Sequence, residues 1–151
     1  MNQVTTSTRQ KVLRLLEWVF AVLGTAVCEV AVIFFASQQL DALWPAPGFY
    51  FIEIVLFGVL VVVNLIKDTN LPGAIWGAIP WVAGGVLLAF VILAGFTIGP
   101  LLFPAMLAFW LAGAAADLRQ RRGLARHFGL AVIAALFQGA LIFAILFLSR
   151  L

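Results

Sequence analysis

The feature that most constrains this chain is a series of long apolar stretches, each about as long as a membrane is thick, with very few charges inside them. Charged residues make up 10% of the 151 residues and hydrophobic residues 65%, whereas a soluble domain carries about 25% charged residues. A membrane-spanning helix needs about 20 apolar residues. The composition therefore predicts an all-α integral membrane protein without a soluble domain.

Short polar or Pro/Gly-containing segments separate the apolar stretches. They lie at residues 37–48, which include Pro45 and Pro47, and then at 67–70, 95–100 and 119–126. Proline and glycine interrupt helices at such positions. We predict a polar, disordered tail at 1–12 and a single transmembrane domain at 13–151. The predicted spans are about 13–36, 49–66, 73–95, 100–117 and 127–148, and the alternative is a four-span bundle.

Basic residues indicate how the chain is oriented. With five spans, eight of the nine Lys and Arg residues fall on the side of the N-terminus, and only Arg150 falls on the other side. Short cytoplasmic loops are enriched in Lys and Arg. We therefore expect a multi-pass protein of a bacterial inner or plasma membrane, with a cytoplasmic N-terminus and an external C-terminus. Four arginines lie close together and either bind anionic lipid or only determine topology: Arg119, Arg121, Arg122 and Arg126.

Two carboxylic acids lie well inside predicted spans, away from the basic side and at similar depths from the outer side. They are Glu29 and Glu53, and an acid at such a depth costs on the order of 2–3 kcal/mol to insert. One interpretation is a shared proton or cation site between two antiparallel spans. Another is a structural hydrogen bond to a neighbouring helix, such as the one that carries Gln138. A third is that Glu53 extends to the water at the interface.

Other residues inside the spans predict packing features. Gln138 lies near mid-span, where polar side chains usually bond to a neighbouring helix. Pro80 lies within a span and predicts a kink. Glu17 lies three residues after Arg14, a spacing suited to a local ion pair. Small residues predict close helix contacts, at Gly24, Gly84, Gly85 and Gly113.

Several kinds of chemistry need residues that the sequence lacks. His127 is its only histidine, so paired-histidine haem ligation and di-iron sites are not expected. No HExxH, P-loop, GxGxxG or CxxC motif occurs. We expect no enzyme activity, no metal and no cofactor. The basic residues flank spans, so we expect lipid rather than nucleic acid as their partner.

The turn Gly95–Pro100 between two apolar helices resembles that of many small bacterial multi-span proteins. The resemblance covers about residues 80–117 and implies no function. We predict a non-catalytic structural or accessory membrane subunit or a regulatory membrane protein, with other membrane subunits or a second copy of itself as the protein partner. The alternative is a small oligomeric transporter or channel for protons or cations that uses Glu29 and Glu53.

Overall fold

A computed structural model describes the backbone of residues 2–38, 46–67, 74–121 and 123–148, and side chains from residues 8, 48 and 77 onward in the first three ranges. Within these ranges the chain is helical apart from turns, as an all-α bundle requires. The helices are α1 (Asn2–Gln38), α2 (Ala46–Lys67), α3 (Ala74–Leu93), α4 (Gly99–Gln120) and α5 (Leu124–Leu148).

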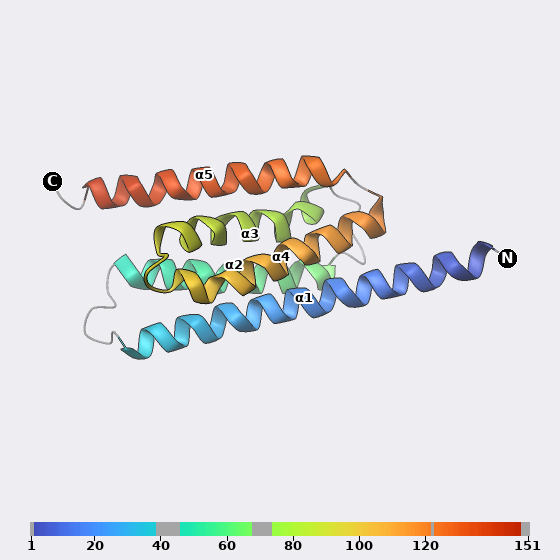
Figure 1. The fold of residues 1–151 in the computed structure, drawn as a ribbon, viewed down its shortest axis with the longest axis horizontal. Coiled ribbons are helices and arrows are strands. Elements are labelled where there is room, and N and C mark those ends of the chain that lie inside the picture. Colours follow the sequence, from blue (N-terminus) through green and yellow to red (C-terminus); the bar gives the residue numbers. More distant parts are fainter. Residues whose placement is uncertain (1, 39–45, 68–73, 122, 149–151) are drawn as a thin grey trace.

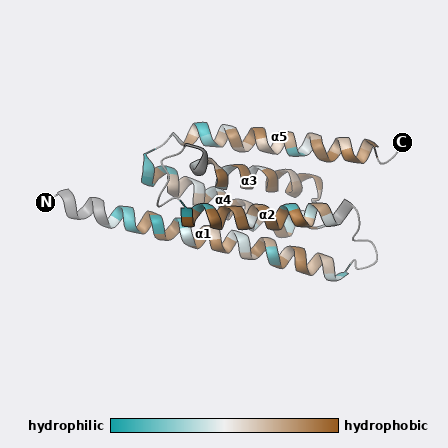
Figure 2. Cartoon of the chain, turned by 180° about the vertical axis from the view of Figure 1, so that it is seen from behind, coloured by the Kyte–Doolittle hydropathy of each residue, from teal (hydrophilic) through white to brown (hydrophobic). Residues whose placement is uncertain are grey.

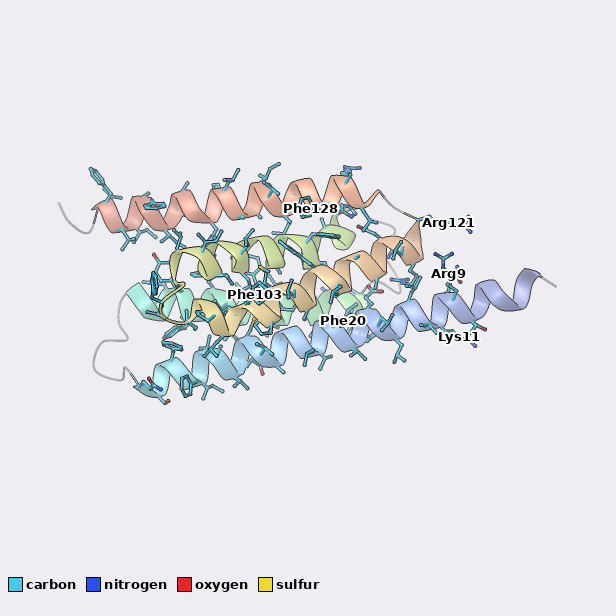
Figure 3. The ribbon with its side chains drawn as sticks, viewed as in Figure 1. Arg9, Lys11, Phe20, Phe103, Arg121 and Phe128 are labelled. Carbon is cyan, nitrogen blue, oxygen red and sulfur yellow. The ribbon has the colours of Figure 1, made fainter. Side chains whose placement is uncertain are left out.

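The helices lie side by side and alternate in direction (Figure 1). α1 forms one flank and packs on α2 and α4, while α5 forms the other flank and rests mainly on α3. The N-terminus and the C-terminus lie at opposite ends of the bundle. The end of α4 and the start of α5 lie at the N-terminal end, which we call the basic end because Arg9, Lys11 and Arg121 lie there (Figure 3).

Four of the helices are long and apolar enough to cross a membrane. They are α1, α2, α4 and α5, and the described apolar part of α3, Gly77–Leu93, is shorter. Hydrophobic residues cover the middle of the bundle, and hydrophilic segments of several helices gather toward the N-terminal end (Figure 2). The chain is therefore a helical membrane protein, and whether α3 makes a fifth complete crossing stays a prediction.

The helix boundaries differ from the sequence-based ones mainly at the ends. Most of the predicted polar tail is part of α1, which begins at Asn2. No proline or glycine interrupts that segment, and a helix that is already nucleated extends at little cost. The connections at 39–45 and 68–73 lie outside the described residues.

The predicted basic loop 119–126 is largely helical. α4 continues to Gln120 and α5 begins at Leu124. Arg121 ends α4 in the left-handed conformation, with φ of 53°, and its N–H donates to the carbonyl oxygen of Asp117. A left-handed residue after the last turn is a common way to end a helix. It brings the two helices together through a very short connection.

Glycines allow the helices to approach closely. A Cβ built on Gly24 of α1 would lie 2.5 Å from the ring of Phe109 in α4, and one on Gly113 of α4 would lie 2.6 Å from the Trp81 indole in α3. A Cβ on Gly85 of α3 would collide with the backbone of Ala131 in α5. These contacts fit the use of small residues at membrane helix interfaces. Glycine thus allows the α1–α4, α3–α4 and α3–α5 contacts.

Candidate functional site

A buried polar cluster joins three helices at the basic end of the bundle. Asp117, in the last turn of α4, is 1% exposed, and His127 of α5 and Trp81 of α3 are buried as well. The Nδ1 atom of His127 lies 2.8 and 2.9 Å from the two carboxyl oxygens of Asp117. The indole Nε1 of Trp81 donates to Oδ2 of the same carboxyl at 3.1 Å. An ionised carboxylate only accepts hydrogen bonds, so in that state the proton between the two side chains belongs to Nδ1.

Sequence reasoning did not select Asp117. The residue follows the apolar run of α4 and precedes the arginines, where an acid normally contacts water. The signal that was present is the pairing of this acid with the single histidine across a predicted turn. The arginine-rich sequence between them does not reveal that the turn is tight enough to bury both.

A second ion pair ties α1 to α4 at the same end. The Arg119 guanidinium donates through Nε to Oε2 of Glu17 at 3.0 Å, and its Nη2 lies 3.5 Å from Oε1. The side chain of Glu17 is 3% exposed and that of Arg119 is 21% exposed. The spacing of Glu17 and Arg14 predicted a local pair, but the pair described in the structure spans 102 positions.

The remaining members of the arginine group differ in their surroundings. Arg121 and Arg126 are exposed, whereas Arg119 is engaged with Glu17. Arg122 lies outside the described residues. The side chains of Arg9, Lys11 and Arg121 lie at one end of the bundle (Figure 3). The name basic end rests on these three residues.

The structure brings Glu53 together with Gln138. The Nε2 atom of Gln138, in α5, donates to Oε2 of Glu53, in α2, at 2.9 Å. Gln138 is buried and Glu53 is partly buried. The bond joins helices whose other contacts are few, because α5 packs mainly on α3. Glu53 therefore takes part in a helix-to-helix contact.

Glu29 is not part of this contact. It is exposed on α1, while its neighbour Cys28 is completely buried. Within the described chain, Glu29 makes no hydrogen bond or ion pair. The two acids thus have different surroundings: Glu53 bonds to α5, and Glu29 lies on the outer surface of the bundle.

Two further features bear on chemistry. Pro80 is buried inside α3, and the carbonyl that it frees belongs to Trp76, whose side chain is outside the described set. Among the described residues, no three His, Cys, Asp or Glu side chains lie close enough to hold a metal ion. Three sets of contacts between described side chains connect helices to one another, and we call them the three ties: Asp117–His127–Trp81, Glu17–Arg119 and Glu53–Gln138.

Compared with known proteins, the chain matches no family model, no curated protein and no solved structure.

Proposed function

We propose that this protein is a non-catalytic structural or accessory subunit of a membrane assembly. The observation that carries the proposal is the difference between the surroundings of the two intramembrane acids. Glu53 is occupied by Gln138, and Glu29 is exposed on the opposite flank helix from the one that carries Gln138. A proton or cation path through the bundle needs acids that face a common hydrated site.

The three ties support the same proposal. They connect α1 with α4, α4 with α5 and α3, and α2 with α5. Polar contacts between membrane helices contribute about 0.6–2 kcal/mol each, and they fix which faces of the helices meet. A bundle held in this way suits a scaffold that presents defined surfaces to its neighbours.

The alternative, a small transporter or channel, predicts that Glu53 or Glu29 titrates during transport. Purified protein in liposomes that contain a pH-sensitive dye tests it directly. The accessory proposal expects no proton flux above that of empty liposomes, and the same result for Glu53→Gln. A flux that the wild type supports and Glu53→Gln abolishes would overturn the proposal.

A positive test of the accessory role is purification in mild detergent followed by identification of the proteins that remain bound. We expect a membrane protein to be retained in a fixed ratio to this chain. The control is the same purification after exposure to a harsh detergent that separates subunits. Retention of nothing but lipid under the mild condition would contradict an accessory role in a larger assembly.

The proposed orientation places the basic end in the cytoplasm. Arg9, Lys11 and Arg121 at one end support it, because positive residues are retained on the cytoplasmic side. Cysteines introduced at Gly123 and after Leu151, in a Cys28→Ala background, should react with an impermeant reagent from opposite sides. Reaction of both from one side would exclude an odd number of crossings.

A further inference from the structure

Glu29 is exposed in a part of the surface that is otherwise apolar. It lies nine residues before Gln38, or roughly 14 Å from the end of α1. The exposed residues around it are large and hydrophobic, with Val30 at 65% and Ile33 at 68% exposure. Among the described residues of α1 between Leu15 and Ala36, Glu29 is the only exposed charged one. An apolar surface is stable against lipid without a partner, but a carboxyl there is not.

One stripe of the exposed side of α1 follows a heptad spacing, with Leu16, Leu23 and Val30 exposed beside it. Six exposed residues follow one another at intervals of four and three positions, and we call them the α1 seam: Leu15, Val19, Val22, Ala26, Glu29 and Ile33. This spacing places side chains on a narrow stripe that suits left-handed packing of two helices.

The α1 seam has β-branched residues in both of its heptad positions. Val19 and Ile33 occupy one of the two alternating positions, with the small Ala26 between them. Leu15, Val22 and Glu29 occupy the other. β-Branched residues at the first position favour two parallel strands, and Glu29, the one polar residue of the seam, meets its counterpart in a second copy only when the two helices are in register.

We propose that a second copy of this chain packs against the α1 seam, so that the two Glu29 carboxyls meet across a twofold axis and share a proton. The inference deepens the proposed function, since it names the first contact of a membrane subunit with a neighbour. Two copies in one membrane have the same orientation, so a twofold axis normal to the membrane makes their α1 helices parallel. A carboxylic acid of one copy donates to the carboxylate of the other, which satisfies both groups without a basic residue at that depth.

The position of α1 and the charges of the chain agree with this arrangement. α1 lies on a flank of the bundle, with α2 and α4 behind it. The seam is therefore accessible to another protein. At the basic end, Arg9 and Lys11 flank the continuation of the seam and face like charges of the second copy. The contact is therefore expected to be tightest between Val22 and Ile33 and to loosen toward the N-terminus.

Disulfide formation between single cysteines tests the proposal. The native Cys28 is buried and is first replaced by Ala. Cysteines are then placed singly at Val22, Ala26 and Ile33, and membranes are oxidised. The matched control is Ile133→Cys on α5, because Ile133 is 63% exposed and Ile33 is 68% exposed, on opposite flanks. We expect rapid disulfide-linked dimers at the seam positions and little product at position 133.

Changes at Glu29 test the shared proton. Glu29→Gln preserves a hydrogen bond between two amides and should retain the crosslinking rate at Ile33→Cys. Glu29→Leu should weaken association by roughly 3- to 30-fold, the range that polar contacts between membrane helices provide. Both variants change an exposed side chain, so folding should be unaffected, and the unfolding temperature checks this.

The other outcomes separate this inference from the proposed function. If another protein and no second copy is crosslinked at the seam, the inferred dimer is overturned and the accessory role stands. Crosslinking equal at Ile33 and Ile133 would indicate random collisions and also overturn the inference. Proton flux that depends on Glu53 would overturn the accessory role while a seam dimer still stands.

Discussion

Asp117 and His127 lie ten positions apart on consecutive helices, yet Nδ1 of the imidazole is within 2.9 Å of both carboxyl oxygens. Asp117 also accepts from Trp81, so one carboxyl contacts two buried ring nitrogens from two other helices. Asp117→Leu leaves both nitrogens without this partner, at a cost of about 3 kcal/mol in the free energy of unfolding. Asp117→Asn keeps one acceptor oxygen and should cost clearly less. Denaturant unfolding in detergent micelles measures both, and equal losses would contradict the role of the acceptor oxygens.

The ion pair between Glu17 and Arg119 should be measurable as a coupling energy. Both side chains have little exposure, and Glu17 has almost none. A double-mutant cycle with Glu17→Gln and Arg119→Gln isolates their interaction from other contacts of each residue. We expect about 1–3 kcal/mol of coupling, above the 0.2–1 kcal/mol of surface pairs. A coupling near zero would show that the two groups do not depend on each other.

Gly85 provides a test of the contact between α3 and α5. A methyl group on this residue would collide with the backbone of Ala131, and a helix backbone cannot move aside as a flexible side chain can. Gly85→Ala should therefore lower the free energy of unfolding by about 1–3 kcal/mol. Gly139→Ala on α5 is the control, because nothing lies within 4 Å of its added Cβ. It should be neutral or stabilise by up to about 1 kcal/mol.

The hydrogen bond between Gln138 and Glu53 predicts coupling between those two residues and none with Glu29. Gln138→Leu leaves the Glu53 carboxyl without its donor. The loss of unfolding free energy in the Glu53→Leu/Gln138→Leu double variant should therefore be smaller than the sum of the two single losses, by about 0.6–1.7 kcal/mol. Glu29→Gln and Glu53→Gln should instead add within about 0.5 kcal/mol. Thermal unfolding of the four single and two double variants is sufficient. Strongly non-additive effects of the Glu29 and Glu53 substitutions on stability would support a shared site.

The sequence was sufficient to predict the fold class, because hydropathy and helix-breaking residues operate locally. The turn after Gly95 lies where the sequence predicts it, and α4 begins at Gly99 with Pro100 at its start. The neighbours of each helix could not be predicted in the same way. All faces of these helices are apolar, so periodicity does not reveal which face is buried, and the pairing of Glu17 with Arg119 depends on an α1–α4 contact between helices distant in the chain.

Local sequence patterns also could not predict which side chains of the candidate site bond to one another. The sequence offered Gln138 as a polar neighbour for an acid, and the structure places it on Glu53. The sequence did not indicate which of the two acids, Glu53 or Glu29, would bond to Gln138, since both are single acids at similar depths. That difference arises from the rotation of α1 about its axis, which Cys28, Gly24 and Ala21 fix by packing inward.

The extensive contact of α1 with α4 has a consequence for biosynthesis. α1 leaves the ribosome before α4. Phe109 packs on Gly24 and Arg119 bonds to Glu17, but both α4 residues are made roughly a hundred residues later. Chains are synthesised from the N-terminus at about 5–20 residues per second, so α1 spends several seconds in the membrane without its main neighbour. During that interval Glu17 lacks its guanidinium, and the first helix is open to other proteins of the insertion machinery. α1 thus enters the bilayer well before the helix that holds it in place.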